Sequence, residues 1–546
     1  MIRRTELVAR LRSQSFDLLI VGGGIVGAGL ARDAAMRGLR VALIEQGDFA
    51  GGTSSKTSKL IHGGLRYLEY GRFRLVRESV RERDTLRTIA PELVWPISLS
   101  LPIYRGDPRP PWKVAAGLTL YDLLAMRWHF NGRRMLSPSQ ARLREPALSP
   151  RDLQAVGSYT DCQMDDARLC LMNVLQAVAF GAVCCNYVRL VEFHKASGVI
   201  VGATIEDLRE RQMIGLSATV VVNATGPWAD AVRRLSDPAA PRRLAPTKGV
   251  HVVVPRVSAG ALFLQARADR RMLFVLPWGD YSLIGTTESD DVDRLDALAA
   301  TPGDVDYLFT EVNRVLPEAS LRPEHIVASF AGARPLLAFD GSSTGASREH
   351  RLEIDRFGLV SIMGGKYTTY RLMAQQTLDA VLRHRTLRAE PCLTDQVSLL
   401  ESTHPVALNR WQEVTRGIAP ELLARLLTTY GTGAFRLLQL LEFEPSLIQP
   451  VCPHHDVIQA ELVYAIQAEL ACTVSDVLVR RTKIAFSSCQ GLDMLSTLTD
   501  VLQRYGRLSP EAIDDQLADY HRFLGQSLAC RGTTRGFHEA YETSRV

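Results

Sequence analysis

The feature that most limits the fold is a glycine-rich turn between an apolar strand and a helix near the N-terminus. Residues 16–45, "FDLLIVGGGIVGAGLARDAAMRGLRVALIE", begin with an apolar run, and their glycines fit the pattern G-x-G-x-x-G. Small residues fill the following helix, and a second apolar run ends at Glu45. Strand, turn, helix and strand in this order predict the first unit of a parallel α/β sheet that binds a dinucleotide.

Each part of this unit has a physical task. Gly22 permits the tight turn, and Gly24 lets a pyrophosphate approach the backbone. Gly27 lets the helix pack closely on the strand, and the helix N-terminus directs N–H groups at the phosphates. The Glu45 carboxylate can accept hydrogen bonds from a ribose and disfavours a 2′-phosphate. The unit therefore predicts FAD or NAD rather than NADP.

The stretch that follows Glu45 separates these two cofactors. Residues 46–71, "QGDFAGGTSSKTSKLIHGGLRYLEYG", neither alternate as a strand does nor show one apolar helix face. An NAD enzyme usually enters another helix–strand pair here, whereas this polar segment can lie along an extended FAD. His62 and Arg66 would then project near the flavin ring. The alternative is a solvent-exposed loop. The residues of this stretch expected to hold FAD are Thr53, Ser54, Ser58 and Leu60.

Length, charge and cysteine usage exclude several classes of protein. The 546 residues predict two to four domains at about 150 residues each. A net charge of +5 is too weak to indicate a nucleic-acid partner. Nine scattered cysteines and an N-terminus without a long apolar core predict a reducing, cytoplasmic location. Cys452 lies near His454 and His455, but no second ligand pair stands at zinc spacing, so we expect no metal site.

Two glycine-rich blocks together resemble those of the FAD-dependent glycerol-3-phosphate dehydrogenases, the aerobic, quinone-linked type. They are "GGGIVGAGLARDAAMRG" and "TSSKTSKLIHGGLRYLE". Later blocks are similar in the family's order: "VVNATGPWAD", "PTKGVHVVVP", "LIGTTESD", "AGARPLL", "MGGKYTTYRLMA" and "ACTVSDVLVRRTKIAF". The chain departs from the pattern at Glu288, where Asp is usual, and its C-terminal region is divergent.

The resemblance implies oxidation of sn-glycerol 3-phosphate to dihydroxyacetone phosphate, by hydride transfer from C2 to FAD, with electrons passed to membrane quinone. A dianionic substrate needs cations, and Arg66, Arg334, Arg348 and Lys366 stand in family-like blocks. Surface ion pairing is their alternative role. His62 is the candidate base, although it could instead hydrogen-bond the flavin. Further residues expected beside the cofactor are Val188, Gly226, Gly364 and Gly365.

Two other functions stay open at this point. One is an oxidase of the same fold that passes electrons to oxygen, and the other is a non-catalytic, flavin-binding regulatory protein. The intact His62, Arg66, Arg334 and Lys366 argue against a decayed site. The sequence does not decide between quinone and oxygen as the electron acceptor.

The expected fold class is α/β. A Rossmann-like FAD-binding domain of the D-amino-acid-oxidase type carries an antiparallel-sheet substrate domain and is followed by a C-terminal α-helical domain. We place the oxidoreductase domain at 16–387, with substrate-domain segments between its FAD-binding segments, and the helical domain at 388–535. The FAD-binding segments are expected at about 16–100, 155–245 and 355–387. A homodimer is left open.

One segment suggests a membrane surface. No apolar run reaches the roughly 18 residues of a membrane-spanning helix, but residues 110–130 are rich in aromatic and basic residues. They predict either an interfacial helix on an anionic membrane, attached peripherally at its cytoplasmic face, or a core helix. The aromatic and apolar residues concerned are Trp112, Leu118, Leu120, Tyr121, Leu124 and Trp128, and the flanking basic residues are Lys113, Arg127, Arg133 and Arg134.

Overall fold

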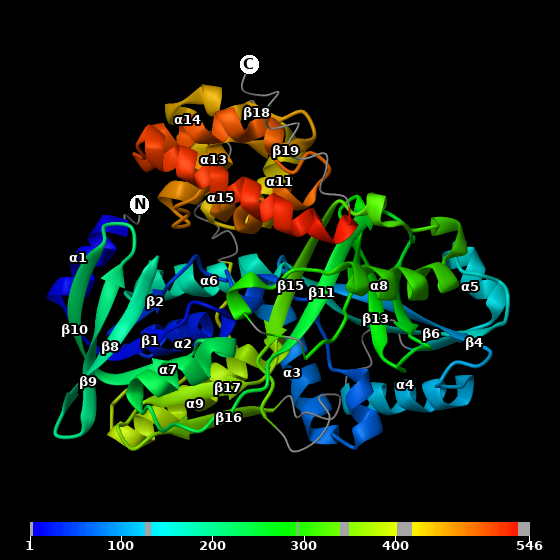
Figure 1. Cartoon of the computed structure of the whole chain (residues 1–546), viewed down its shortest axis with the longest axis horizontal. Helices are drawn as coiled ribbons and strands as arrows, with labels where there is room; N and C mark the ends of the chain where they lie inside the picture. Colours follow the sequence, from blue (N-terminus) through cyan, green and yellow to red (C-terminus); the bar gives the residue numbers. More distant parts are fainter. Residues whose placement is uncertain are drawn as a thin grey trace.

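Two large β-sheets and a helical unit make up the part of the protein that the structure describes. The computed structural model describes residues 4–125, 133–290, 292, 294–338, 349–400 and 418–532. In Figure 1 the first sheet lies on the left, the second on the right, and the helical unit lies above both.

The first sheet has a parallel centre with the order β17-β10-β1-β2-β7. At one edge β16 is antiparallel to β17, and β9 links the β8–β9 hairpin to β10. Its strands are β1 (Ser15–Val21), β2 (Val41–Glu45), β7 (Val183–Asn186), β8 (Val188–Ala196), β9 (Val199–Asp207), β10 (Gln212–Asn223), β16 (His350–Ile354) and β17 (Val360–Gly364). The main helices packed with it are α2 (Ile25–Met36), α6 (Asp166–Ala179) and α9 (Tyr370–Arg385).

Strand β1 forms the centre of this sheet because it is apolar on both faces. Leu18, Leu19 and Ile20 are fully buried, which suits a parallel strand covered by helices on each side. Leu19 pairs with Val221 of β10 and with Ala42 of β2. Parallel strands end at the same edge of a sheet, so the segments after β1, β2, β10 and β17 come together there.

The second sheet has the order β15-β11-β14-β13-β12-β4-β6-β3, and β5 pairs with β6. All its neighbours are antiparallel except β12 and β4. Its strands are β3 (Leu60–Ile61), β4 (Val94–Tyr104), β5 (Arg134–Leu136), β6 (Leu153–Met164), β11 (Thr247–Pro255), β12 (Ala261–Gln265), β13 (Met272–Trp278), β14 (Tyr281–Gly285) and β15 (Ala328–Arg334). Strands β11, β13 and β14 carry the apolar runs "HVVVP", "MLFVLPW" and "YSLIG".

Strand β11 shows how this sheet is held between two layers. Val250, Val252 and Val254 share a core with helix α8 (Pro302–Val315). Val253 faces the opposite way and belongs to the core that contains the C-terminal helices. Both faces of the sheet are therefore covered, which explains why Val252, Val253 and Val254 follow one another without a polar residue between them.

The helical unit follows residue 418. It comprises α11 (Pro420–Tyr430), α12 (Gly433–Phe443), α13 (Gln459–Gln467), the π-helix η10 (Asp476–Arg481), α14 (Leu495–Gly506) and α15 (Pro510–Leu528), with a hairpin of β18 (Pro450–Cys452) and β19 (His455–Ile458). The remaining α-helices are α1 (Arg4–Ser13), α3 (Phe73–Ile89), α4 (Pro111–Ala125), α5 (Pro138–Arg144) and α7 (Ala229–Ser236). The predicted domain boundaries stay predictions.

Helix α4 is in part a core helix, which was one of the two roles that its sequence left open. Leu118 and Tyr121 lie in the core, so these two residues are unavailable to a membrane. Trp112 and Leu123, in contrast, are 72% and 70% exposed. Trp128 and Arg127 lie outside the described residues. Among the helices that the structure describes, none is both long and apolar enough to cross a bilayer.

Candidate active site

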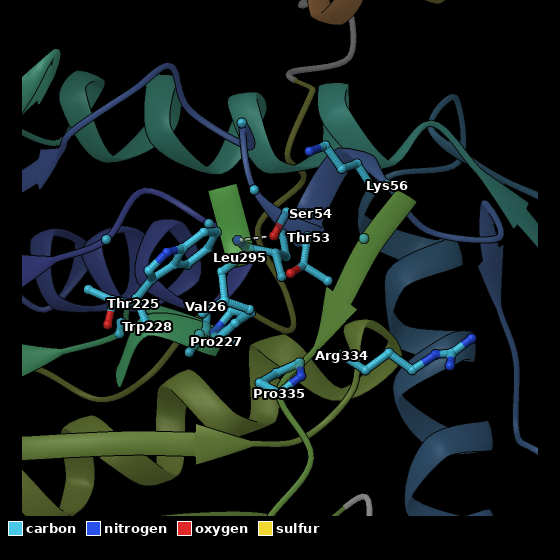
Figure 2. A pocket seen from close by; sticks show the side chains of 18 of the residues that line it. Val26, Thr53, Ser54, Lys56, Thr225, Pro227, Trp228, Leu295, Arg334 and Pro335 are labelled. Carbon is cyan, nitrogen blue, oxygen red and sulfur yellow. Dashed lines mark hydrogen bonds between the residues drawn. The ribbon is translucent and has the colours of Figure 1, made fainter. Parts of the chain in front are cut away.

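A cavity of about 750 Å³ lies where the strand ends of the first sheet meet the second sheet. Figure 2 shows Val26, Pro227 and Trp228 on one side of it, and Lys56 and Arg334 on the other. Eleven of the residues predicted to hold the cofactor line it: Gly22, Gly24, Glu45, Thr53, Ser54, Ser58, Leu60, Val188, Gly226, Gly364 and Gly365.

The glycines of the first turn are required by close backbone packing. Gly22 has φ +109°, and a Cβ there would lie 2.7 Å from the carbonyl oxygen of Ala224. Gly27 is not in the cavity wall, because it faces the turn itself. A Cβ at Gly27 would lie 1.9 Å from the oxygen of Gly22. Any side chain at Gly27 would therefore push helix α2 away from the strand end.

Helix α2 directs its N-terminus into the cavity. Gly24 is the N-cap and has no side chain with which to cap the first turn. The Ile25 N–H donates to Ser54 Oγ over 2.9 Å, and the Ser54 hydroxyl keeps its own proton to donate. This arrangement of N–H groups, hydroxyl and helix dipole fits a pyrophosphate. The Thr53 hydroxyl instead donates to the carbonyl of Ala333, 2.7 Å away, and ties this loop to β15.

Glu45 ends β2 at the cavity wall. Its two carboxylate oxygens accept hydrogen bonds from the N–H groups of Gly23 (2.7 Å) and Gly47 (2.8 Å). Burial raises the pKa of Glu45, and these two N–H groups oppose that shift. The carboxylate is thus fixed in place with lone pairs left to accept ribose hydroxyls. The donor set of this end of the cavity, glycines, helix N-terminus and fixed carboxylate, fits the adenosine diphosphate part of FAD.

We expect Glu45→Ala to weaken FAD retention about tenfold to a hundredfold, because hydrogen bonds to a charged group contribute about 1.5–3 kcal/mol. The ratio of flavin to protein absorbance after extensive gel filtration measures this. Glu324→Ala is the matched control, since Glu324 is 63% exposed. If Glu45→Ala retains FAD as the wild type does, Glu45 does not contact the ribose.

The opposite end of the cavity gathers cations and imidazoles. His62, Arg334 and Lys366 all line it, as the sequence predicted. Arg334 Nη2 donates to Thr286 Oγ1 (2.9 Å) and to the carbonyl of Thr287 (3.2 Å), and Lys366 Nζ lies 4.8 Å from the ring centre of Tyr67.

Of the two other predicted arginines, only Arg66 can be placed. Arg66 is half-buried in the 3₁₀ turn η2 (Leu65–Tyr70) and is not among the lining residues that the structure describes. Arg348 lies outside the described residues.

His251, which was not among the predicted site residues, lines the same end. Its Nε2 lies 2.9 Å from Ser58 Oγ, and its ring stacks on Phe330 with centroids 5.1 Å apart. Burial, together with the charges of Arg334 and Lys59, holds the pKa of His251 well below its usual range, so the imidazole is neutral. A signal was present, because a lone histidine interrupts the apolar run "VHVVV" of β11. Lys56 was also missed, and burial lowers its pKa.

The helical unit supplies Arg480 to the cavity wall. Asp48, three residues after Glu45, accepts from Arg480 Nε (2.5 Å) and from Arg481 Nη1 (2.7 Å). Asp476 accepts from Arg480 in turn, over 2.6 Å. Although burial opposes it, the charges of Arg481 and Arg480 lower the pKa of Asp48 to about 2. Buried ion pairs thus connect the loop after β2, which contains Asp48, to the helical unit.

Comparison with known proteins accounts for this arrangement. Residues 17–371 match the family described as FAD dependent oxidoreductase, and residues 360–513 match the C-terminal domain of alpha-glycerophosphate oxidase. Glycerol-3-phosphate dehydrogenase of Synechocystis sp. is 36% identical, covering 95% of this chain and 98% of its own length. Glycerol-3-phosphate dehydrogenase 2 of Mycobacterium bovis is 37% identical, covering 94% and 88%.

A solved structure agrees over nearly the whole chain. It is glycerol-3-phosphate dehydrogenase from Bacillus halodurans complexed with FAD, with a TM-score of 0.78, 28% identity and coverage of 96% of this chain and 97% of that one. The predicted fold class and the predicted cofactor, FAD, are confirmed at the level of the family. The chain belongs to the FAD-dependent glycerol-3-phosphate dehydrogenase family.

Proposed function

We propose that the protein oxidises sn-glycerol 3-phosphate to dihydroxyacetone phosphate and passes the electrons to membrane quinone. The observation that carries the proposal is the chemical difference between the two ends of the cavity. One end is built for adenosine diphosphate, and the other gathers Arg334 and Lys366 beside two imidazoles. The names of the relatives support the same substrate.

The cationic end fits a small dianion. Arg334 presents a planar guanidinium that Thr286 and the Thr287 carbonyl hold in one orientation, which suits two-point contact with a phosphate. The Lys366 ammonium adds a second positive charge to the same wall.

The reaction removes a hydride from C2 and a proton from its hydroxyl. When bound, FAD would supply the hydride acceptor. His62 lines the cavity from the strand end of β3 and is our candidate for taking the hydroxyl proton, since a neutral imidazole suits a base at neutral pH. His251, kept neutral and hydrogen-bonded to Ser58, would help orient the neighbouring polar groups.

Turnover of the purified protein tests the proposal. With glycerol 3-phosphate we expect fast reduction of a quinone analogue and slow formation of hydrogen peroxide in air. Fast peroxide formation with slow quinone reduction would instead show that the protein is an oxidase that passes its electrons to oxygen. A flavin that stays oxidised on anaerobic mixing with glycerol 3-phosphate would remove the substrate assignment.

We also propose peripheral attachment to an anionic membrane, through the surface of α4 that carries Trp112 and Leu123. Quinone is dissolved in the bilayer, so its reduction needs such contact. The exposed aromatic and aliphatic side chains can enter the interface, and the basic Lys113, Arg133 and Arg134 can approach anionic headgroups.

The double change Trp112→Ser and Leu123→Ser should weaken binding to anionic vesicles by at least tenfold, because each apolar side chain contributes about 1.5–3 kcal/mol when buried. Sedimentation with vesicles at low and high salt measures this. Phe443→Ser is the control, since Phe443 is 90% exposed but belongs to the helical unit. Equal vesicle binding by the double variant and the wild type would contradict attachment through α4.

A further inference from the structure

Two thiols and an imidazole come together in the helical unit, away from the cavity. Cys452 ends β18 and pairs with His455, the first residue of β19, across the hairpin. Cys489 approaches from a turn 34 residues after His455. Their ligand atoms, two Sγ and one ring nitrogen, all lie within 4.8 Å of one another.

The spacing of these atoms fits a tetrahedral metal ion. Cys489 Sγ lies 3.4 Å from His455 Nε2. With metal–sulfur and metal–nitrogen distances of about 2.3 and 2.0–2.1 Å, a tetrahedral ion holds its sulfur and nitrogen ligands about 3.5 Å apart. The thiol and the ring nitrogen are therefore already at the separation that a shared ion requires.

The chemistry of the donors selects the ion. We propose that Cys452, His455 and Cys489 form a Zn²⁺ site with three protein ligands and a fourth position open to water. Two thiolates and an imidazole favour Zn²⁺ over Mg²⁺ or Ca²⁺, which prefer oxygen ligands. Cys452 is buried, whereas His455 and Cys489 are half-buried, so an ion can reach the site from solvent. The Ser487 hydroxyl, 3.0 Å from His455 Nε2, lies beside the ligands and can hydrogen-bond the water.

The site would brace the contact between the helical unit and the second sheet. The N–H of Ser488, next to Cys489, donates to the Tyr281 hydroxyl of β14 over 2.8 Å. Phe486 packs on Phe330, with centroids 5.7 Å apart, and Phe330 stacks on His251 of the cavity. A metal that fixes this turn to the β18–β19 hairpin would thus stabilise the wall behind the cavity.

Cobalt and zinc titrations of the full-length flavoprotein test the proposal. The protein is prepared without a histidine tag, treated with a chelator and reduced. We expect one equivalent of Co²⁺ to give the intense near-ultraviolet thiolate charge-transfer band, measured as a difference spectrum against the flavin, and Zn²⁺ to abolish it. Zn²⁺ should also raise the melting temperature. Cys489→Ser and Cys452→Ser should lose the band and the shift.

Cys392→Ser is the matched control, because Cys392 is a half-buried free thiol far along the chain from this cluster and should leave both readouts unchanged. Flavin content reports folding of every variant, and His455→Gln gives a second variant should a serine variant lose its flavin. A band that persists in Cys489→Ser, or no thiolate band in the wild type, would overturn the proposal. A Cys452–Cys489 disulfide without metal binding by the reduced protein would overturn it as well.

Discussion

Asp48→Asn is expected to lower the free energy of unfolding by about 3–5 kcal/mol and to release FAD, because removing one partner leaves buried charge uncompensated. Asp48 is 3% exposed, and its carboxylate holds the guanidiniums of Arg480 and Arg481. The same residue continues the loop whose Gly47 N–H binds Glu45. One substitution should therefore loosen both the helical unit and the ribose-binding end of the cavity.

Urea unfolding and flavin content measure the two effects together. Asp519→Asn is the control, since Asp519 and its partner Arg522 are both about two-thirds exposed and surface pairs contribute about 0–1 kcal/mol. If Asp48→Asn and Asp519→Asn unfold at the same urea concentration and Asp48→Asn keeps its flavin, the buried charges do not hold the helical unit to the loop that follows β2.

The pH dependence of the free energy of unfolding should show the contribution of Asp48. The folded pKa of Asp48, about 2, is lower than its ordinary value of 3.8. Its stabilisation is therefore fully present above pH 3.8 and is lost as the pH falls towards 2. Asp48→Asn should remove this part of the acid unfolding curve, so that the stabilities of the wild type and the variant converge only below about pH 2.

The first unit of the fold could be predicted because its signals are local. The turn glycines, the small residues of α2 and the acid that ends β2 lie within 30 residues, and each acts on its near neighbours. The family resemblance predicted His62, from an early block, and Arg334 and Lys366, from later blocks, as residues of one site, and all three line the cavity.

Contacts between residues that are far apart in the sequence leave no local pattern from which they could be predicted. Asp48 and Arg480 are 432 residues apart, and neither sits in a periodic pattern that would pair them. Cys489 is likewise far from Cys452 and His455 in the sequence. Without it, those two residues alone did not predict a metal site. The Thr53 hydroxyl was expected to face phosphate, yet it is held by the Ala333 carbonyl of β15. Such outcomes depend on how the two sheets and the helical unit pack.

Arg334→Ala is expected to lower kcat/KM for glycerol 3-phosphate about tenfold to a hundredfold while leaving flavin content unchanged. A hydrogen bond to a charged group contributes about 1.5–3 kcal/mol, and Arg334 lies at the cationic end of the cavity, away from Glu45. Arg334→Lys should recover only part of the loss, because a point charge cannot reproduce the planar fork that Thr286 orients. Arg322→Ala, at a 70% exposed position, should behave as the wild type.

Glycerol without its phosphate separates binding of the phosphate from other roles of Arg334. We expect wild type to oxidise glycerol poorly and Arg334→Ala to change that slow rate little, since the lost contact is made to the phosphate. His62→Ala should differ in kind, by depressing kcat on both substrates and removing the acidic limb of the pH profile. If Arg334→Ala instead loses activity equally on glycerol and on glycerol 3-phosphate, the guanidinium acts on the reacting carbon or the flavin, and the cationic end of the cavity needs another anionic ligand to explain it.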